Sequence, residues 1–311
     1  MVQKKKKLFF NQFQSISINS EILVFILFIE FIFIFIRSEI SQDFFLKKNK
    51  TKQMEGVAKQ LFDACVKGNA EEIKQLLETN PQLNINCQDY EGQTPFFIAC
   101  EFGRIEVVKL LLNDQRVNKN QLNKCHQSPF WIACWKGYIE VVKLLLKDQE
   151  IDVNETNVNG WTPLFSVCFY GSLNIVKLLL KDNRVDVNKG DQEGKTACFV
   201  ACQNGRIDVL ECILASGRDM NLENRFGKTL FDFVGELQQK GKWPWENDNI
   251  YFEKRKNWER IAELLKLFKI NPSGTRFKLR KQLRWAGNIY NFYFFFFKYF
   301  FFLIKINYFK K

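Results

Sequence analysis

The sequence is poor in the residues on which most active sites depend. It contains a single histidine, His126, among 311 residues, so histidine-based acid–base catalysis or a catalytic triad has one candidate. The phosphate-binding pattern G-x-x-x-x-G-K-[ST] and the dinucleotide pattern G-x-G-x-x-G are both missing. Carboxylates are frequent but scattered along the chain. These absences predict a protein that is not an enzyme and that needs no cofactor.

The chain also lacks an uninterrupted apolar run of the about 20 residues that a membrane-spanning helix needs. The longest run, residues 22–36, has 15 residues and includes Glu30. It follows a basic stretch, as in a signal peptide, but no small-residue cleavage site comes after it. The ends 1–53 and 288–311 hold 19 of the 33 phenylalanines. Two interpretations of these ends stay open: a membrane anchor, or translated non-coding sequence from an A/T-rich gene.

The middle of the chain repeats with a period of 34 residues. Four glycines are spaced at this interval, and each is followed four residues later by an apolar stretch such as VVKLLL; they are Gly103, Gly137, Gly171 and Gly205. Thr94-Pro95, Ser128-Pro129 and Thr162-Pro163 keep the same register. Chance does not keep several features in step over four periods, so we expect one structural unit in tandem copies.

Each unit is predicted to be a pair of helices. A hydroxyl residue followed by proline is typical of a helix start, so the first helix runs from Thr94 towards Phe102. Gly103 then ends it with a left-handed cap. The second helix starts near Ile105 and has a wide apolar face, and a polar stretch rich in Asp, Asn and Gly forms the turn to the next unit. One pair cannot bury this much apolar surface alone, so the pairs must stack.

The segments TPFFIACEFGRIEVVKLLL and GWTPLFSVCFYGSLNIVKLLL resemble the ankyrin repeat, over about residues 57–234 with an interrupted last unit to 270. The resemblance implies an all-α solenoid of about five to six helix-turn-helix units with projecting turns. It departs from the family where the usual histidine after T-P-L is replaced by Phe97, Trp131, Phe165 and Phe199. In the family that histidine links successive turns by hydrogen bonds. Here we expect side-chain packing, in place of these hydrogen bonds, to hold successive turns together.

The C-terminal part of the repeat region is irregular. The ankyrin-repeat domain is predicted to cover residues 54–270, with a loop insertion near 235–256 and a second helix only at 257–268. The segment 271–287 is basic, with apolar residues interleaved. It is predicted to be a helix that closes the end of the stack. An amphipathic helix for an acidic partner or a membrane surface is the alternative.

The cysteines and the histidine have structural interpretations. A single column of the repeat holds Cys65, Cys100, Cys134, Cys168 and Cys202, where the family has a small buried alanine. Cysteine acts as a small hydrophobe in such places, and the close pair Cys198 and Cys202 lacks the second pair that a zinc site needs. His126 aligns with turn glycines and is predicted to take a positive φ.

The ankyrin resemblance also assigns a binding surface. In the family, the residue before T-P and the two residues before the glycine that ends the first helix face bound partners. Here those positions, with a turn-tip tyrosine, are Tyr90, Gln93, Glu101, Phe102, Gln127, Trp135, Lys136, Trp161, Phe169, Tyr170, Lys195, Gln203 and Asn204. Aromatic side chains are frequent in binding hot spots. The alternative is that these rings fold against neighbouring helices and only thicken the core.

The function predicted from these observations is a non-catalytic scaffold or adaptor that binds a protein partner on its concave face. We expect a monomer. We also expect a cytoplasmic location, because nine cysteines favour a reducing compartment. No nucleic acid and no metal is expected. The alternative is a membrane-tethered receptor or channel-associated subunit held by the terminal apolar segments.

Overall fold

The computed structural model describes residues 56–239 and 248–283, which belong to one compact unit that begins at Gly56. This part of the chain is all-helical, apart from an isolated bridge between Glu223 and Thr229. The helices are α4 (Val57–Lys67), α5 (Ala70–Thr79), α6 (Pro95–Glu101), α7 (Ile105–Leu112), α8 (Pro129–Lys136), α9 (Ile139–Leu146), α10 (Pro163–Tyr170), α11 (Leu173–Lys181), α12 (Ala197–Gln203), α13 (Ile207–Ser216), α14 (Leu230–Gln239), α15 (Asp248–Ile270) and α16 (Pro272–Gln282). The predicted all-α fold is confirmed.

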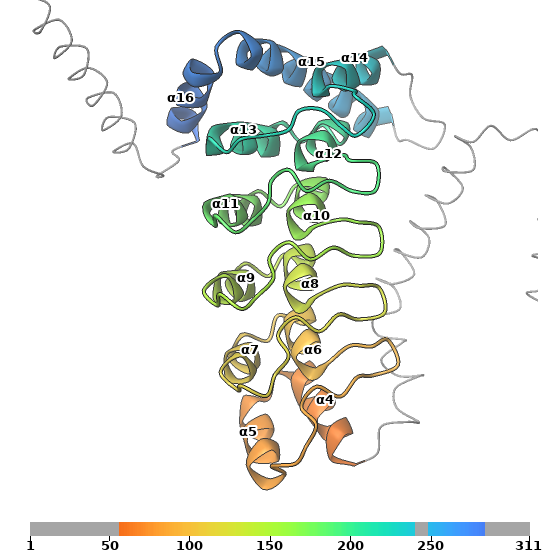
Figure 1. The fold of residues 1–311 in the computed structure, drawn as a ribbon, viewed down its shortest axis with the longest axis vertical. Helices are drawn as coiled ribbons and strands as arrows, with labels where there is room; N and C mark the ends of the chain where they lie inside the picture. The colour runs from red at the N-terminus through yellow and green to blue at the C-terminus, as the bar shows by residue number, and fades with distance from the viewer. Residues whose placement is uncertain (1–55, 240–247, 284–311) are drawn as a thin grey trace, which may run out of the picture. The chain divides into compact units, whose positions relative to one another are not determined.

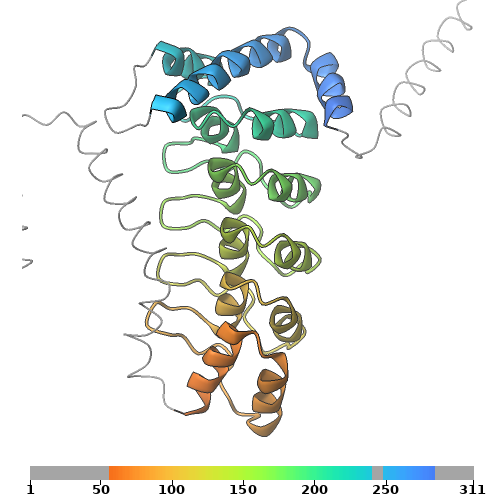
Figure 2. The same ribbon diagram turned by 180° about the vertical axis from the view of Figure 1, so that it is seen from behind.

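Figures 1 and 2 show the helices in two columns. The first helices of the units, α4, α6, α8, α10 and α12, lie one above the other, and the second helices α5, α7, α9, α11 and α13 form the column beside them. The turns between units project from the side of the first helices, at the right of Figure 1. Counting α14 with α15, the described residues form six helix pairs, in agreement with the solenoid of five to six units.

The predicted start and stop signals work as expected. The hydroxyl oxygens of Thr94, Ser128 and Thr162 accept hydrogen bonds from the backbone N–H three residues on, at 3.0–3.1 Å. The following proline occupies the first turn in each case. Gly137 and Gly171 end α8 and α10 with φ near +80°, where a side chain would be strained. Local sequence therefore fixes where these helices begin and end.

The core lies between the two columns of helices. The second helices bury the same two positions of VVKLLL in successive units, such as Val107 and Leu111 in α7 and Val141 and Leu145 in α9. The first helices bury the cysteine column, which has no exposed surface at any of its five positions. Because every unit buries the same columns, the apolar core runs continuously along the stack.

Asparagine side chains join successive units through their backbones. Asn154 donates its Nδ2 hydrogen to the carbonyl oxygen of Arg184 at 2.7 Å and accepts a bond from the N–H of Asp186 at 2.7 Å. Three further asparagines, at corresponding positions, bridge the next unit in the same way, and they are Asn86, Asn120 and Asn188. We call these four residues the asparagine ladder. Each satisfies one carbonyl and one N–H of a turn that has no regular partner.

The last unit differs from the prediction. The loop expected over 235–256 is helical over most of its length, because α14 continues to Gln239 and α15 already begins at Asp248. Tyr251, in the part of α15 that precedes the predicted segment 257–268, is buried, so the helix packs on the stack before the start that the pattern indicated. The linking residues 240–247 lie outside the described part.

The end of the stack is closed by α15 and α16, as Figure 2 shows. The indole N–H of Trp258 in α15 donates to the carbonyl of Cys202 at the end of α12, at 2.9 Å. The guanidinium of Arg280 in α16 donates to the carbonyls of Ala215 and Ser216 at the end of α13, at 2.7 and 3.2 Å. The predicted basic helix is thus present over residues 272–282 and packs on α13.

No helix in residues 56–239 and 248–283 combines the length and the apolarity needed to span a bilayer. The predictions for 1–53 and 288–311, as anchor or as translated non-coding sequence, fall outside the described residues. They stay predictions.

Candidate partner-binding surface

Aromatic side chains at the end of α8 and along α10 form one continuous cluster. The ring of Trp135 lies 6.2 Å from that of Tyr170, edge to face, and Tyr170 lies 5.0 Å from Phe169. Phe169 in turn stacks on Trp161 at 5.3 Å. These four residues, Trp135, Trp161, Phe169 and Tyr170, are each half-buried, and we call them the aromatic surface. The structure therefore brings together four of the predicted site residues from two units.

Two rings of the aromatic surface, those of Trp135 and Trp161, rest on deeper aromatic residues. Trp135 stacks on Trp131 at 5.9 Å, and Trp161 lies 5.2 Å from Phe165. Both supporting rings are buried. The alternative that the rings fold against the helices is thus seen in part, because Trp135 and Trp161 pack on buried rings. The geometry holds the rings in fixed positions, and aromatic pairs at these separations are favourable.

Trp131 corrects one expectation. It occupies the position of the family's histidine and is buried with 3% exposure, as predicted. Its indole N–H, however, donates to the carbonyl of Trp161 in the next turn, at 2.8 Å. Packing is therefore not the only link between these two turns, because a buried indole N–H finds a hydrogen-bond partner where one is in reach.

The remaining predicted positions lie around or away from the aromatic surface. Lys136 lies over the ring of Trp135, with Nζ 4.7 Å from the ring centre. Glu101 and Phe102 are half-buried at the end of α6. Tyr90 is 76% exposed at a turn tip, where the ammonium of Lys124 lies 4.4 Å from its ring.

The polar positions are engaged within the turns and helix ends. The side-chain oxygen of Gln127 accepts a hydrogen bond from Asn123 at 3.0 Å, and Lys195 pairs with Glu193 at 2.6 Å. Asn204 donates to the carbonyl of Val200 at 3.0 Å. Gln93 is half-buried and Gln203 is exposed. These residues line the turn side of the stack without joining the aromatic cluster.

His126 has the backbone that its alignment predicted. Its φ is +55°, and in the described residues no other non-glycine residue has a positive φ. Its N–H donates to the carbonyl of Asn123 at 2.9 Å, within the turn. The side chain of Asn123 also accepts from the N–H groups of Cys125 and Gln127. His126 is therefore a turn residue, in the place that glycine takes in the neighbouring units.

The buried cysteines are held in the neutral form. Burial raises the pKa of Cys198 to about 12, and burial, with a smaller effect of Cys65, also raises the pKa of Cys100 far above its ordinary value. A thiolate is the form that attacks substrates or binds metals. In the described ranges 56–239 and 248–283, no group of three or more His, Cys, Asp or Glu side chains is placed to hold a metal ion.

The comparison with known families agrees with the geometry. The family model for ankyrin repeats (3 copies) matches residues 61–157 and 130–224, which together cover more than half of the chain. The chain belongs to the ankyrin repeat family. Ankyrin repeats are protein-interaction modules and are typically non-catalytic. A search among curated proteins found no match.

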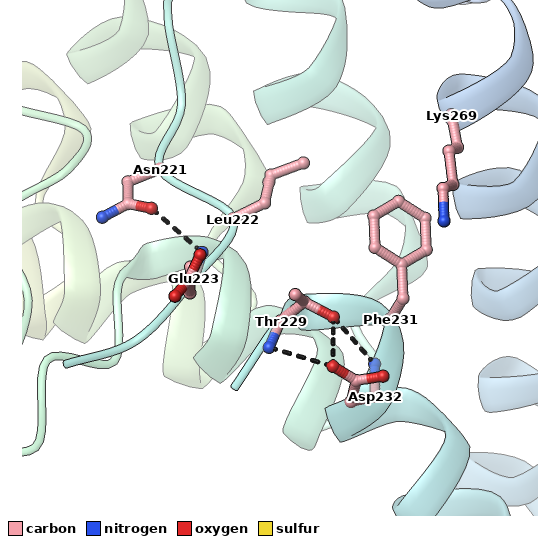
Figure 3. Close-up of a pocket in the computed structure, with 7 residues that line it drawn as sticks. All are labelled: Asn221, Leu222, Glu223, Thr229, Phe231, Asp232 and Lys269. Carbon is pink, nitrogen blue, oxygen red and sulfur yellow. Dashed lines mark hydrogen bonds between the residues drawn. The ribbon is translucent and has the colours of Figure 1, made fainter. Parts of the chain in front are cut away.

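The ankyrin stack also has a hollow that the sequence did not indicate. It has a volume of about 430 Å³ and lies where the last turn meets α14 and the end of α15 (Figure 3). The residues that line it are Asn221, Leu222, Glu223, Thr229, Phe231, Asp232 and Lys269. The pattern Thr-x-x-Asp at 229–232 is a signal for a helix start, but nothing in the sequence places Lys269 beside it.

Local contacts engage several polar groups of this hollow. Thr229 and Asp232 bond reciprocally at the start of α14: the Thr229 hydroxyl donates to the Asp232 carboxylate at 2.6 Å and accepts from the Asp232 N–H at 3.2 Å (Figure 3). These hydrogen bonds lower the pKa of Asp232. Lys269 lies over the ring of Phe231 at 5.2 Å. The residues that line the hollow therefore serve to cap the start of α14 and to make a cation–π contact. We assign the hollow no ligand.

Proposed function

We propose that this ankyrin-repeat protein is a non-catalytic scaffold or adaptor that binds a protein partner through the aromatic surface. One observation carries the proposal: Trp135, Trp161, Phe169 and Tyr170 form a continuous, half-exposed row across two units. Tryptophan and tyrosine are enriched among residues that dominate binding energy. The rings pack on one another, and those of Trp135 and Trp161 also pack on buried rings, so binding has little side-chain freedom left to remove.

The polar residues around the row support a role in orienting the partner. Lys136 lies over the ring of Trp135, and Lys195 occupies in the next unit the repeat position that Trp161 has in its own; both are partly accessible. Charges at the edge of an interface act mainly on association rate and specificity. The apolar contribution to affinity comes from the rings, and the partner's approach is directed by the side chains around them.

The proposal includes a reducing, cytoplasmic location. All nine cysteines are free thiols, and seven are buried in the core. A chain with many unpaired cysteines is typical of compartments in which thiols stay reduced. Fractionation of cells followed by detection of the chain would test this part, and recovery only from a secreted fraction would contradict it.

The test of the aromatic surface is a paired capture experiment with the full-length chain. One bait is the natural sequence, and the other carries Trp135→Ala, Phe169→Ala and Tyr170→Ala. Bound proteins are identified by mass spectrometry, and circular dichroism checks that the variant is folded. We expect a partner that the natural sequence retains and the variant loses.

A matched control distinguishes binding by this surface from non-specific binding through exposed aromatic rings. Phe226→Ala with Phe252→Ala removes two exposed rings, 67% and 63% accessible, that are not part of the aromatic surface. This control should retain the partner. If the control and the surface variant lose the same proteins, or neither loses any, the proposed binding surface is wrong.

A further inference from the structure

The two parts of the described structure carry opposite net charge. Residues 56–239, which form the repeat stack and α14, contain 20 Lys and Arg against 24 Asp and Glu. Residues 248–283, which form α15 and α16, contain ten Lys and Arg against four Asp and Glu. The helix α16 itself has four basic residues and no acidic one. The positive charge of the described structure is thus concentrated at the closed end of an acidic stack.

The same end exposes apolar side chains. Ile270 is 82% exposed and Leu267 is 53% exposed at the end of α15, and Phe277 in α16 is 54% exposed. On α16 the buried Leu279 and the half-buried Arg276 and Arg280 share one face. Helical spacing then places Phe277 with the exposed lysines Lys278 and Lys281 on the opposite face. We call Leu267, Ile270, Phe277, Lys278 and Lys281 the basic corner.

The basic corner is held in place by the fold. Arg280 fixes α16 to the end of α13 through the carbonyls of Ala215 and Ser216. The hydroxyl of Thr275 donates to the carbonyl of Leu267 at 3.1 Å, which joins the start of α16 to the end of α15. Figure 1 shows α16 beside α13, on the side of the stack opposite the projecting turns. The exposed side chains therefore lie on two adjoining helix segments at the closed end of the stack.

We propose that the basic corner binds the surface of an anionic membrane. Lysines without acidic neighbours on their helix are attracted to anionic headgroups, and protruding Ile, Leu and Phe side chains suit insertion into the interface between headgroups and acyl chains. The apolar side chains of the corner stand out from helix surfaces, a shape that a soft lipid interface accommodates. This contact is peripheral and is separate from the proposed protein-binding function.

The test uses the full-length chain and vesicles of two compositions. One set is phosphatidylcholine, and the other is equal parts phosphatidylcholine and phosphatidylserine. Bound protein is measured by sedimentation. Lys278→Gln with Lys281→Gln should weaken binding to the anionic vesicles by about fivefold for each lysine removed. Lys74→Gln with Lys181→Gln makes the same change in net charge on exposed helix positions of the stack, and this control should bind like the natural sequence.

A second pair of variants tests the apolar part. Ile270→Ser should reduce binding to the anionic vesicles by about tenfold, because a buried aliphatic side chain is lost from the interface. Val158→Ser removes an aliphatic side chain that is 51% exposed at a turn tip and should leave binding unchanged. Both positions are exposed, so folding is expected to survive, and circular dichroism verifies it.

Three outcomes would overturn the proposal. Equal binding to the two vesicle compositions would exclude recognition of anionic lipid. If the corner variants and their controls bind the vesicles equally well, the binding belongs to another part of the chain, which includes the terminal segments that all variants share. If the chain does not bind vesicles but does bind polyglutamate, the occupant of the corner is an acidic protein.

Discussion

The inner units and the C-terminal end solve the same packing problem with different residues. Between inner units, Asn154 of the asparagine ladder bridges a carbonyl and an N–H of the following turn. The corresponding position of the last turn is Glu223. Its N–H donates to the side chain of Asn221, just as the N–H of Asn154 donates to the side chain of Asp152. A carboxylate accepts hydrogen bonds but cannot donate to a carbonyl when ionised. The ladder therefore ends where the repeats end.

At the closed end, residues distant in sequence take over the contacts that a further repeat would make. Arg184 and Arg218 each donate to carbonyls at the end of the preceding unit's second helix, those of Leu146 and Asp182. For α13 this role passes to Arg280, 65 residues after its acceptor Ala215. Each inner repeat thus provides the groups that cap the repeat before it. The second helix α13 has no such repeat after it and is capped by α16 instead.

The largest expected effect concerns that cap. Trp258→Ala removes a 5% exposed indole and its bond to the Cys202 carbonyl, and we expect the free energy of unfolding to fall by about 3–5 kcal/mol. Urea unfolding of the full-length chain, followed by circular dichroism, measures the change. Phe252→Ala is the control on the same helix, where an exposed ring should matter by no more than about 0.5 kcal/mol. Equal losses would mean that α15 does not cap the stack.

A smaller effect separates the ladder from its end. Asn154→Ala leaves the Arg184 carbonyl and the Asp186 N–H without their partner, and it should cost about 1–3 kcal/mol. Glu223→Ala at the corresponding end position should change stability by less than about 0.5 kcal/mol. The same urea experiment compares the two. If Glu223→Ala is as costly as Asn154→Ala, the view that the ladder stops at Glu223 fails.

The next prediction concerns pH and an ion pair between inner units. Burial of Asp148 opposes its ionisation, but hydrogen bonds from Lys119 and from the Glu150 N–H, with the charges of Lys119 and Arg184, lower its pKa overall. A carboxyl with a lower pKa in the folded state stabilises the fold above its unfolded pKa of about 3.9. That stability is lost as the pH falls through the folded pKa.

Lys119→Met tests this pair, in which Lys119 Nζ lies 2.7 Å from the Asp148 carboxylate. At pH 7 the variant should be less stable than the natural sequence by under about 1 kcal/mol. The difference should shrink towards zero as the pH is lowered below the pKa of Asp148. Urea unfolding at pH 7 and in acid measures it. A difference that stays constant over this range would show that the pair contributes through packing and not through charge.

The smallest effect concerns the turns. His126 has φ +55° where the neighbouring units have Gly92 and Gly160. His126→Gly should raise stability by about 0.5 kcal/mol, because relief of backbone strain exceeds the added flexibility of the unfolded chain. Gly160→His is the reverse change and should destabilise. Thermal unfolding of both variants checks the sign, and a stability loss in His126→Gly would show that its side chain has a role the turn does not explain.

Much of the fold and part of the site could be predicted from short stretches of sequence. Thr94-Pro95 and Gly103 bound the first helix of their unit because caps act within a few residues. His126 took the predicted positive φ because its turn repeats one that uses glycine. The ring-to-ring contact of Trp135 with Tyr170 and the bond from Trp131 to Trp161 could not be read this way. Both join residues of neighbouring units, and side-chain orientation across that gap depends on the packing between them.

The sequence by itself determined the repeat, its period, the helix boundaries of the inner units and the buried columns. These features follow from hydrogen bonds and apolar spacing within each 34-residue copy. Only the tertiary structure decided how the stack ends, how far α14 and α15 extend, and that the basic end also exposes Ile270 and Phe277. The reason is physical: Trp258 and Arg280 act on carbonyls 56 and 65 residues earlier in the chain, and no local pattern records such contacts.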